Sequence, residues 1–265
     1  MKTNGMFGEL VFYLESCESG SMFPTLDATE KIFAVTASNA TQSSYAAYCG
    51  REAKVNGKKI GSCLGDLFSI NWMEDTEAAD VSVETLNDQF ETVLTLTTAS
   101  PVMKFGDFSF MTEPIGDFEG TCDTEISFTE RMIKKASHYY KKYTAEKREL
   151  GELVDSRDHN LHFLYEQVLL KGTEEAYTAM HKELDHRKFI DGVFRENFGE
   201  MANAPETPQN FDCLRMLLSE LEETCGEWSD YSLKYVRKVA NACDTMTEDQ
   251  IGDLMANVST HCTAQ

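Results

Sequence analysis

A cysteine that follows a short apolar run is the residue of this chain best placed to do chemistry. Residues 10–14 are β-branched, aromatic or aliphatic, are too few for a helix and end at polar residues, which is typical of a buried strand. Cys17 comes three positions after this run, and Gly20 can relax the turn behind it. Because open α/β sheets build their sites at the carboxyl ends of strands, Cys17 is a candidate nucleophile.

The residues beside Cys17 do not by themselves favour catalysis. A lone cysteine next to a strand is usually a small buried hydrophobe. Glu15 and Glu18 are acidic and disfavour the thiolate form. A reactive Cys17 therefore needs a base or a positive group from elsewhere in the protein.

Four sequence blocks, in order, resemble the legumains, a family also called asparaginyl endopeptidases or vacuolar processing enzymes. Residues 10–22 look like the nucleophile segment of that family. Residues 36–45 and 63–75 are similar to the next two blocks, and residues 102–107 match a shorter one. The resemblance covers roughly residues 8–107.

The resemblance implies the fold and the division of the chain. Legumains have a caspase-like α/β catalytic domain, a six-stranded sheet with helices on both faces, followed by an all-α prodomain. We therefore expect an N-terminally truncated caspase-like sheet in residues 1–125. A helical linker and activation-peptide region is expected in residues 126–208, and a four-cysteine helical prodomain in residues 209–265. Residues 32–36 predict a second strand.

The resemblance also assigns the chemistry. Cys17 falls on the nucleophile, and its backbone N–H would be one of the oxyanion donors. Family specificity is for asparagine, and for aspartate at lower pH. The matching pocket positions are Glu15, Ser43, Ser44 and Asp66, whose carboxylates can accept the amide protons of asparagine. Turn formation is the alternative role for Asp66, and loop solvation is the alternative for the two serines.

The catalytic histidine of the family has no counterpart in this chain. The family places it further before the cysteine than the sixteen residues available here. None of the histidines follows a strand in a His-Gly turn, and they show no metal-ligand spacing: His138, His159, His162, His181, His186 and His261. We expect no cofactor, an N-terminal part of the natural protein that is missing here, and no peptide hydrolysis by the chain as it stands.

The second half of the chain has helical periodicity, and residues 127–130 and 247–250 have the capping-box pattern that opens a helix. In the family this region is an inhibitory prodomain that covers the active site and is released on acidification. The resemblance places the processing site at Asp155, with Asn160 as the alternative. A neutral aspartic acid mimics asparagine better than aspartate does, so processing at Asp155 would need low pH.

Helix geometry restricts the pairing of the four C-terminal cysteines. Cys213 and Cys225 lie at opposite ends of one predicted helix, about 18 Å apart, whereas a disulfide needs Cα atoms within about 7 Å. If the first two helices form an antiparallel hairpin, Cys213 meets Cys243 and Cys225 is left for Cys262. The legumain prodomain has four cysteines in a similar arrangement; free buried thiols are the alternative.

The remaining cysteines lie in the first half of the chain. Cys49 and Cys63 flank a short segment and could close a surface loop, as they do in plant-type legumains. Cys122 is left over and is expected to be unpaired. Eight cysteines favour an oxidising compartment.

Charge and hydropathy narrow the classes of partner. A formal charge of -21 argues against nucleic acid and against docking on anionic membranes. No stretch is long and apolar enough to span a bilayer, and residues 1–5 do not begin a signal peptide. The expected partners are protein or peptide substrates and the prodomain of the same molecule. By resemblance, the expected location is the lysosome or vacuole, or outside the cell.

Two other functions fit parts of the pattern. The helical half could act as a non-catalytic interaction or inhibitory module that binds a related peptidase. A transamidase that attaches lipid anchors shares the catalytic fold, but it lacks the four-cysteine helical tail.

Overall fold

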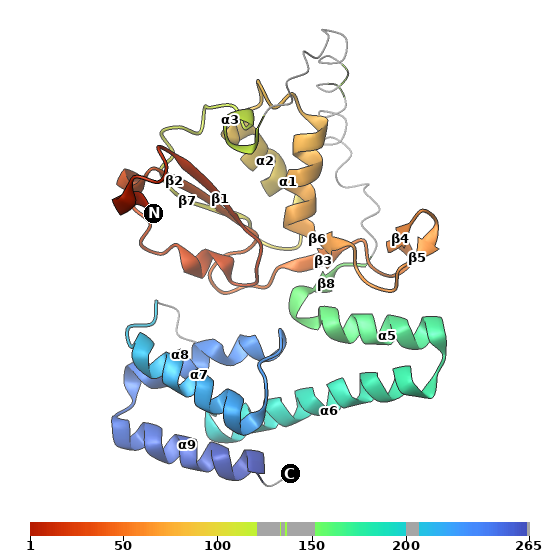
Figure 1. Ribbon diagram of the computed structural model, residues 1–265, viewed down its shortest axis with the longest axis vertical. Coiled ribbons are helices and arrows are strands. Elements are labelled where there is room, and N and C mark those ends of the chain that lie inside the picture. The colour runs from red at the N-terminus through yellow and green to blue at the C-terminus, as the bar shows by residue number, and fades with distance from the viewer. Residues whose placement is uncertain (121–132, 134–135, 137–151, 200–206, 264–265) are drawn as a thin grey trace. The chain divides into compact units, whose positions relative to one another are not determined.

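The computed structural model describes residues 1–120, 133, 136, 152–199 and 207–263 (Figure 1). The chain forms two compact units, Met1–Ser156 and Arg157–Gln265, and each is described by itself. The expected boundary near residue 125 and the expected capping box that opens at Ser127 lie outside the described residues, so the three-part division stays a prediction. Cys122 also lies outside them.

The first unit is built on a three-stranded mixed sheet. Its strands, in spatial order, are β1 (Leu10–Leu14), β2 (Ile32–Thr36) and β7 (Met103–Gly106). β1 and β2 are parallel, with Leu10 opposite Ile32, whereas β7 is antiparallel to β2. The two strands expected at residues 10–14 and 32–36 are confirmed. The α/β class expected for this half is confirmed with them.

Two helices pack with this sheet, α1 (Leu67–Ala78) and α2 (Leu86–Leu96), and a short α3 (Gly116–Glu119) follows. Their shared core contains Phe33 and Val35 from β2, Phe68 from α1 and Phe90 from α2. Tyr13 of β1 stacks on a tryptophan of α1, with ring centroids 4.9 Å apart. This packing fixes the ends of β1 and β2, where the loops begin.

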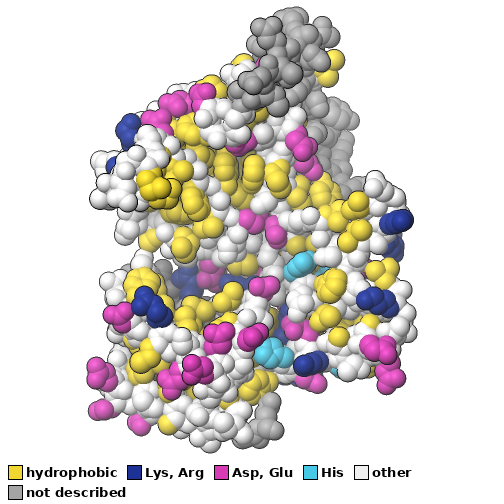
Figure 2. All heavy atoms as spheres, in the orientation of Figure 1, with side chains coloured by type: hydrophobic (Ala, Val, Ile, Leu, Met, Phe, Trp, Pro, Cys, Tyr) yellow, Lys and Arg dark blue, Asp and Glu magenta, His cyan; other side chains and the backbone are white. Residues whose placement is uncertain are grey.

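Hydrophobic side chains also gather on the visible face of the first unit, over the sheet (Figure 2). The sheet and its following loops carry large apolar side chains with more than a third of their surface exposed, namely Phe12, Met22, Met103 and Phe108. The sheet and its loops therefore leave several large apolar side chains open to solvent.

A second small sheet lies beside the first. Its order is β6 (Gly65–Asp66), β3 (Tyr45–Ala47) and β8 (Val154–Asp155), and all its pairings are antiparallel. Between β3 and β6 the chain forms a hairpin of β4 (Lys54–Val55) and β5 (Lys58–Lys59). A disulfide between Cys49 and Cys63 closes the base of this hairpin.

The second unit is all helical. Its helices are α5 (His159–Lys171), α6 (Glu174–Asn197), α7 (Phe211–Cys225), α8 (Val236–Thr245) and α9 (Glu248–Thr263). The predicted capping box at the start of α9 is present: Gln250 N–H donates to Thr247 Oγ1 at 3.3 Å, and Thr247 N–H donates to Gln250 Oε1 at 2.9 Å. None of the described helices has the length and apolar character needed to cross a membrane.

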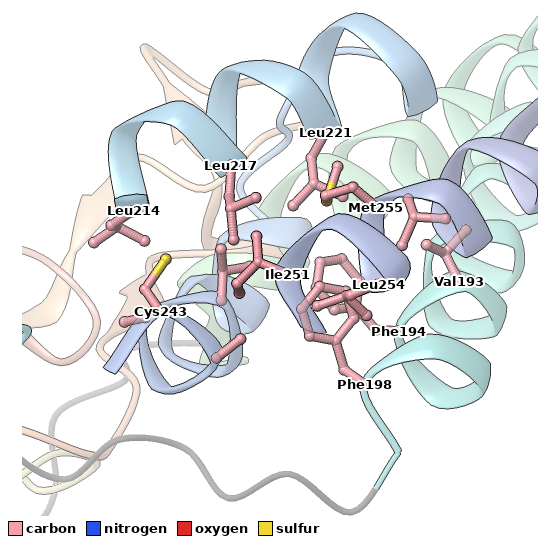
Figure 3. Close-up of a cluster of buried hydrophobic side chains, with 14 of the residues drawn as sticks. Val193, Phe194, Phe198, Leu214, Leu217, Leu221, Cys243, Ile251, Leu254 and Met255 are labelled. Carbon is pink, nitrogen blue, oxygen red and sulfur yellow. The ribbon is translucent and has the colours of Figure 1, made fainter. Parts of the chain in front are cut away.

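The core of the second unit is formed by one face each of α6, α7, α8 and α9 (Figure 3). Leu217, Val193, Val239 and Val258 are all fully buried. Disulfides join Cys213 to Cys243 and Cys225 to Cys262, with Cα atoms 5.7 Å and 5.1 Å apart. These are the two pairs predicted from helix length together with an antiparallel hairpin of the first two helices. α7 is thus held to its neighbours at both ends.

Replacing a fully buried core residue tests this packing. We expect Leu217→Ala to lower the free energy of unfolding of the second unit by ~3 kcal/mol, because the substitution leaves a cavity. The measurement is urea unfolding of the full chain, followed by far-ultraviolet circular dichroism. Met216→Ala is the matched control: its side chain is 55% exposed on the same helix, so the expected change is within about 0.5 kcal/mol. Equal effects of the two substitutions would contradict the packing described here.

Candidate active site

The candidate site is built by the two loops that leave β1 and β2 at the same edge of the sheet. Cys17 lies in the first loop and Ser38 in the second. Ser19 and Ser38, both buried, bind each other: Ser38 N–H donates to Ser19 Oγ at 3.0 Å, and Ser19 N–H donates to Ser38 Oγ at 3.2 Å. Ser38 Oγ also donates to the carbonyl of Ser16 at 3.0 Å. The segment that carries Cys17 is thereby held at the carboxyl end of two parallel strands, where α/β sheets place their sites.

Gly20 is needed for close approach between these loops. A Cβ added at Gly20 would lie 2.9 Å from the carbonyl carbon of Asn39. The left-handed backbone of this turn belongs instead to Glu18, whose φ is 55°. Any side chain at position 20 would therefore push the two loops apart. The expectation that Gly20 relaxes the turn was wrong, because the turn uses Glu18 for that purpose.

The thiol of Cys17 is half-buried, is not in a disulfide and faces Ser44. Ser44 N–H donates to Cys17 Sγ at 3.4 Å, and Ser44 Oγ lies 3.7 Å from the same sulfur. Both contacts come from the residue that precedes β3. The sulfur is thus positioned between the end of β1 and the start of β3.

A small polar pocket continues from Ser44 to the end of β6. Ser44 Oγ lies 3.1 Å from Ser156 Oγ, and Ser156 Oγ donates to Asp66 Oδ1 at 2.9 Å. Ser156 directly follows β8, which pairs with β3 along the same edge. A side chain from far along the sequence therefore reaches the groups beside the thiol.

Glu15 is the second carboxylate of this pocket. Its Oε2 accepts hydrogen bonds from the backbone N–H and the hydroxyl of Ser69, at 2.8 Å and 2.9 Å. Its Oε1 is buried and accepts no hydrogen bond from any residue that the structure describes. Burial raises the pKa of Glu15 to about 7; the Asp66 carboxylate adds to this, and the bonds from Ser69 oppose it. A buried acid with a free oxygen suits a ligand that donates hydrogen bonds.

The remaining residues expected at the site are placed as follows. Ser43 is half-buried next to Ser44. Asp155 is half-buried in β8 opposite Tyr45, so the side chain bound to Ser44 and Asp66 is that of the following residue. Asn160 is exposed in the first turn of α5, in the second unit.

Ser156 is the residue of this pocket that sequence reasoning missed. The pairing of Asp155 with Tyr45 would have pointed to it, but a two-residue strand has no periodic sequence signal. Ser69, which binds Glu15, was also missed, since nothing in the sequence marks the first turn of a helix as part of a pocket.

No histidine occurs among the described residues of the unit that contains Cys17. The described histidines, His159, His162, His181, His186 and His261, all belong to the second unit, and His138 lies outside the described residues. Within the described part of the first unit, no group of histidine, cysteine and carboxylate side chains has the geometry of a metal site.

The raised pKa of Glu15 makes a prediction about stability. Because folding favours the neutral carboxyl, the stability that Glu15 contributes is complete below about pH 4.5 and is lost as the pH rises through about 7. Glu15→Gln should therefore stabilise the chain at neutral pH, by ~3 kcal/mol at most, and should have little effect at low pH. Thermal unfolding against pH measures this. The exposed Glu91→Gln is the control, and a Glu15→Gln effect that does not depend on pH would contradict the argument.

Comparison with known proteins gives two family matches and a set of relatives. Residues 1–121 match the Peptidase C13 family, and residues 200–262 match the legumain prodomain. The chain is 31% identical over 270 residues to a vacuolar-processing enzyme of Citrus sinensis, covering 91% of this chain and 52% of that protein. It is 32% identical over 271 residues to the Vicia sativa enzyme, with the same two coverages.

A third relative, the vacuolar-processing enzyme delta-isozyme of Arabidopsis thaliana, is 31% identical over 265 residues, which cover 90% of this chain and 54% of that protein. The chain thus spans about half the length of the curated relatives it matches. The two family matches occur in the order that the sequence blocks predict, with the peptidase part first and the prodomain last. The chain belongs to the C13 peptidase family, the legumains, and contains part of the peptidase domain followed by the legumain prodomain.

Proposed function

We propose that this chain is part of a cysteine endopeptidase zymogen that cleaves after asparagine, and after aspartate at low pH. The observation that carries the proposal is the pairing of β8 with β3 beside a free thiol. An extended segment of polypeptide lies on a strand edge, with its next side chain in a polar pocket next to Cys17. Adding a strand to an exposed edge is a common way for a protein to bind an extended peptide.

In the proposed reaction the sulfur of Cys17 attacks the carbonyl carbon of the scissile bond. The thiol proton passes to a base and then to the leaving amine, the C–N bond breaks and a thioester remains, which water hydrolyses. The backbone N–H of Cys17 would donate to the oxyanion, since no described group accepts a hydrogen bond from it. The family resemblance makes the base a histidine, which the described part of the first unit does not contain.

The pocket has the polarity that an asparagine side chain requires. Asp66 already accepts a hydrogen bond from a hydroxyl there, and an amide N–H₂ can replace that donor. The Ser44 hydroxyl can donate to the amide carbonyl, with Ser43 beside it. Glu15 supplies a second acceptor. Below about pH 7 Glu15 becomes neutral, which lowers the negative charge of the pocket and admits an aspartic acid side chain.

The zymogen state follows from what occupies the pocket. Ser156 lies where the proposed substrate side chain would bind, but its hydroxyl is shorter than an asparagine amide. β8 would therefore occupy the edge without offering a preferred cleavage residue. Processing after Asp155 or Asn160 would cut the chain beside β8 and free it to leave the edge, and the helical unit would act as the intramolecular prodomain. Acidic compartments, the lysosome or vacuole, or secretion into an acidic space, fit this chemistry.

We expect the purified 265-residue chain to show no cleavage of an asparagine-containing peptide, because the unit that holds Cys17 has no described histidine to act as base. The measurement is release of a fluorophore from such a peptide across the acidic to neutral range, with Cys17→Ala as the control. Cleavage that disappears in Cys17→Ala would contradict this expectation.

A chimera tests the peptidase proposal directly. With the N-terminal half of the Citrus sinensis relative placed before Met1, we expect asparaginyl cleavage that Cys17→Ala abolishes and Asp66→Ala reduces at least about tenfold, since Asp66 binds the substrate side chain. A folded chimera with all three described disulfides and no such cleavage would reject the proposal.

Processing can be tested by adding the same relative to this chain at acid pH. Mass spectrometry should detect a new end after Asp155 or Asn160, and the double variant Asp155→Ala/Asn160→Ala should stay intact. If the relative binds the chain tightly without cutting it, the interaction-module function is favoured instead. No new end after either residue would reject the proposed processing sites.

A further inference from the structure

The contact between β8 and β3 shows how an extended segment lies along this edge. Asp155 is opposite Tyr45, and Val154 is opposite Ala46. With Ser156 in the polar pocket, the residues before it continue along β3 in the antiparallel direction. The neighbours of these earlier residues therefore form a recognition surface beyond the pocket itself.

The two positions next along the edge are apolar. Val154 is 8% exposed and packs against Ala46 and the Cys49–Cys63 disulfide. Leu153 is half-buried and packs against a separate buried cluster. That cluster consists of Ala47, Leu67 and Ile70, with Tyr48 and Ala99 at its border. Apolar side chains two and three residues before the pocket residue can thus pack against this surface.

Beyond Leu153, the antiparallel direction leads toward the end of β3 and the hairpin that follows it. Leu153 and Tyr48 border the same buried cluster, and the chain after Tyr48 enters the disulfide at Cys49. The hairpin itself turns at Asn56 and Gly57, whose φ angles of 51° and 77° suit a tight two-residue turn. Its base is covalently closed directly after β3.

This hairpin is basic in a chain that is strongly acidic. Residues 50–62 contain four basic residues and one acidic residue, whereas the formal charge of the whole chain is -21. The four basic residues are all exposed: Arg51, Lys54, Lys58 and Lys59. Basic side chains are visible at the position of the hairpin in Figure 2. Because the pocket at the start of β3 is acidic and the hairpin after β3 is basic, negatively charged residues of a bound peptide are attracted to the hairpin end of β3 only.

We propose that the β3 edge and this basic hairpin together select peptides by residues before the cleavage position. The preferred peptide has apolar side chains two and three residues before the pocket residue and acidic side chains from the fourth residue back. The chain's own segment has this pattern, with Glu152 preceding Leu153 and Val154. This inference rests on the proposed function for the identity of the pocket residue, but binding can be measured without catalysis.

The test is peptide binding to the full chain after the edge has been vacated by Leu153→Ser/Val154→Ser. The probe is a fluorescein-labelled peptide, Glu-Glu-Leu-Val-Asp-Asn, followed by fluorescence anisotropy. We expect it to bind roughly tenfold more tightly than Lys-Lys-Leu-Val-Asp-Asn at low salt, with the difference largely lost in ~0.5 M NaCl. Glu-Glu-Ser-Ser-Asp-Asn should bind about tenfold more weakly than the first peptide, because it leaves the apolar positions empty.

The preference for the acidic over the basic peptide must depend on the lysines of the hairpin. Lys54→Gln/Lys58→Gln/Lys59→Gln should abolish the preference for the acidic peptide. The matched control, Lys171→Gln/Lys182→Gln/Lys188→Gln, makes the same change in net charge on exposed residues of the helical unit and should retain the preference. Equal binding of acidic and basic peptides, or a preference that survives the hairpin substitutions, would overturn the proposal.

If the Leu153→Ser/Val154→Ser variant fails to fold, the role of the hairpin is tested in the chain that keeps Leu153 and Val154. Hydrogen exchange of the Tyr45 to Ala47 amides should become several-fold faster when the three hairpin lysines are replaced, because β8 would be held less tightly. Unchanged exchange would overturn the proposal. Absence of cleavage in the chimera, together with charge-dependent binding here, would reject the peptidase function and leave this recognition surface standing.

Discussion

The hydrogen bonds between Ser19 and Ser38 are the constraint on which the site depends. They join the loops that follow two parallel strands, and both serines are almost fully buried. Losing one hydroxyl would leave buried polar groups unpaired, at a cost of about 1–3 kcal/mol. The close approach at Gly20 and the bond from Glu18 N–H to the carbonyl of Gln42, 2.7 Å, follow from the same junction. Cys17 lies between these contacts, so its position is set by the backbone around it.

The pocket next to this junction combines burial with negative charge. The Asp66 carboxylate opposes ionisation of Glu15, and the free oxygen of Glu15 has no described donor. Such an arrangement is unfavourable in the empty site at neutral pH and becomes favourable when a ligand brings N–H groups or when the pH falls. The basic hairpin supplies charge of the opposite sign, and it does so at the far end of the β3 edge. The proposed recognition by charge along one strand edge would therefore use side chains of two short segments.

The helical unit is stabilised by an apolar core and by two disulfides. Its core joins four helices, and its disulfides span 30 and 37 residues of sequence. Cross-links over loops of this length restrict the unfolded chain, so they support a unit that has few residues in which to build a core. Phe194 stacks on Tyr235 with ring centroids 4.1 Å apart, which adds a contact between α6 and the short turn before α8. The fold of this unit is thus secured within its own residues.

The sequence by itself determined the parts whose signals are local. Apolar runs predict β1 and β2, capping residues predict the start of α9, and helix length excludes a Cys213–Cys225 bond. The blocks around Cys17 predict the family, which the comparisons show. Only the tertiary structure decided what surrounds the thiol. Ser156 lies 112 residues from Ser44 and 90 from Asp66, and a two-residue strand brings it there. Burial and the charge of Asp66 raise the pKa of Glu15. Neither can be predicted from the residues beside Glu15, because contacts between residues far apart in the sequence depend on how the whole chain packs.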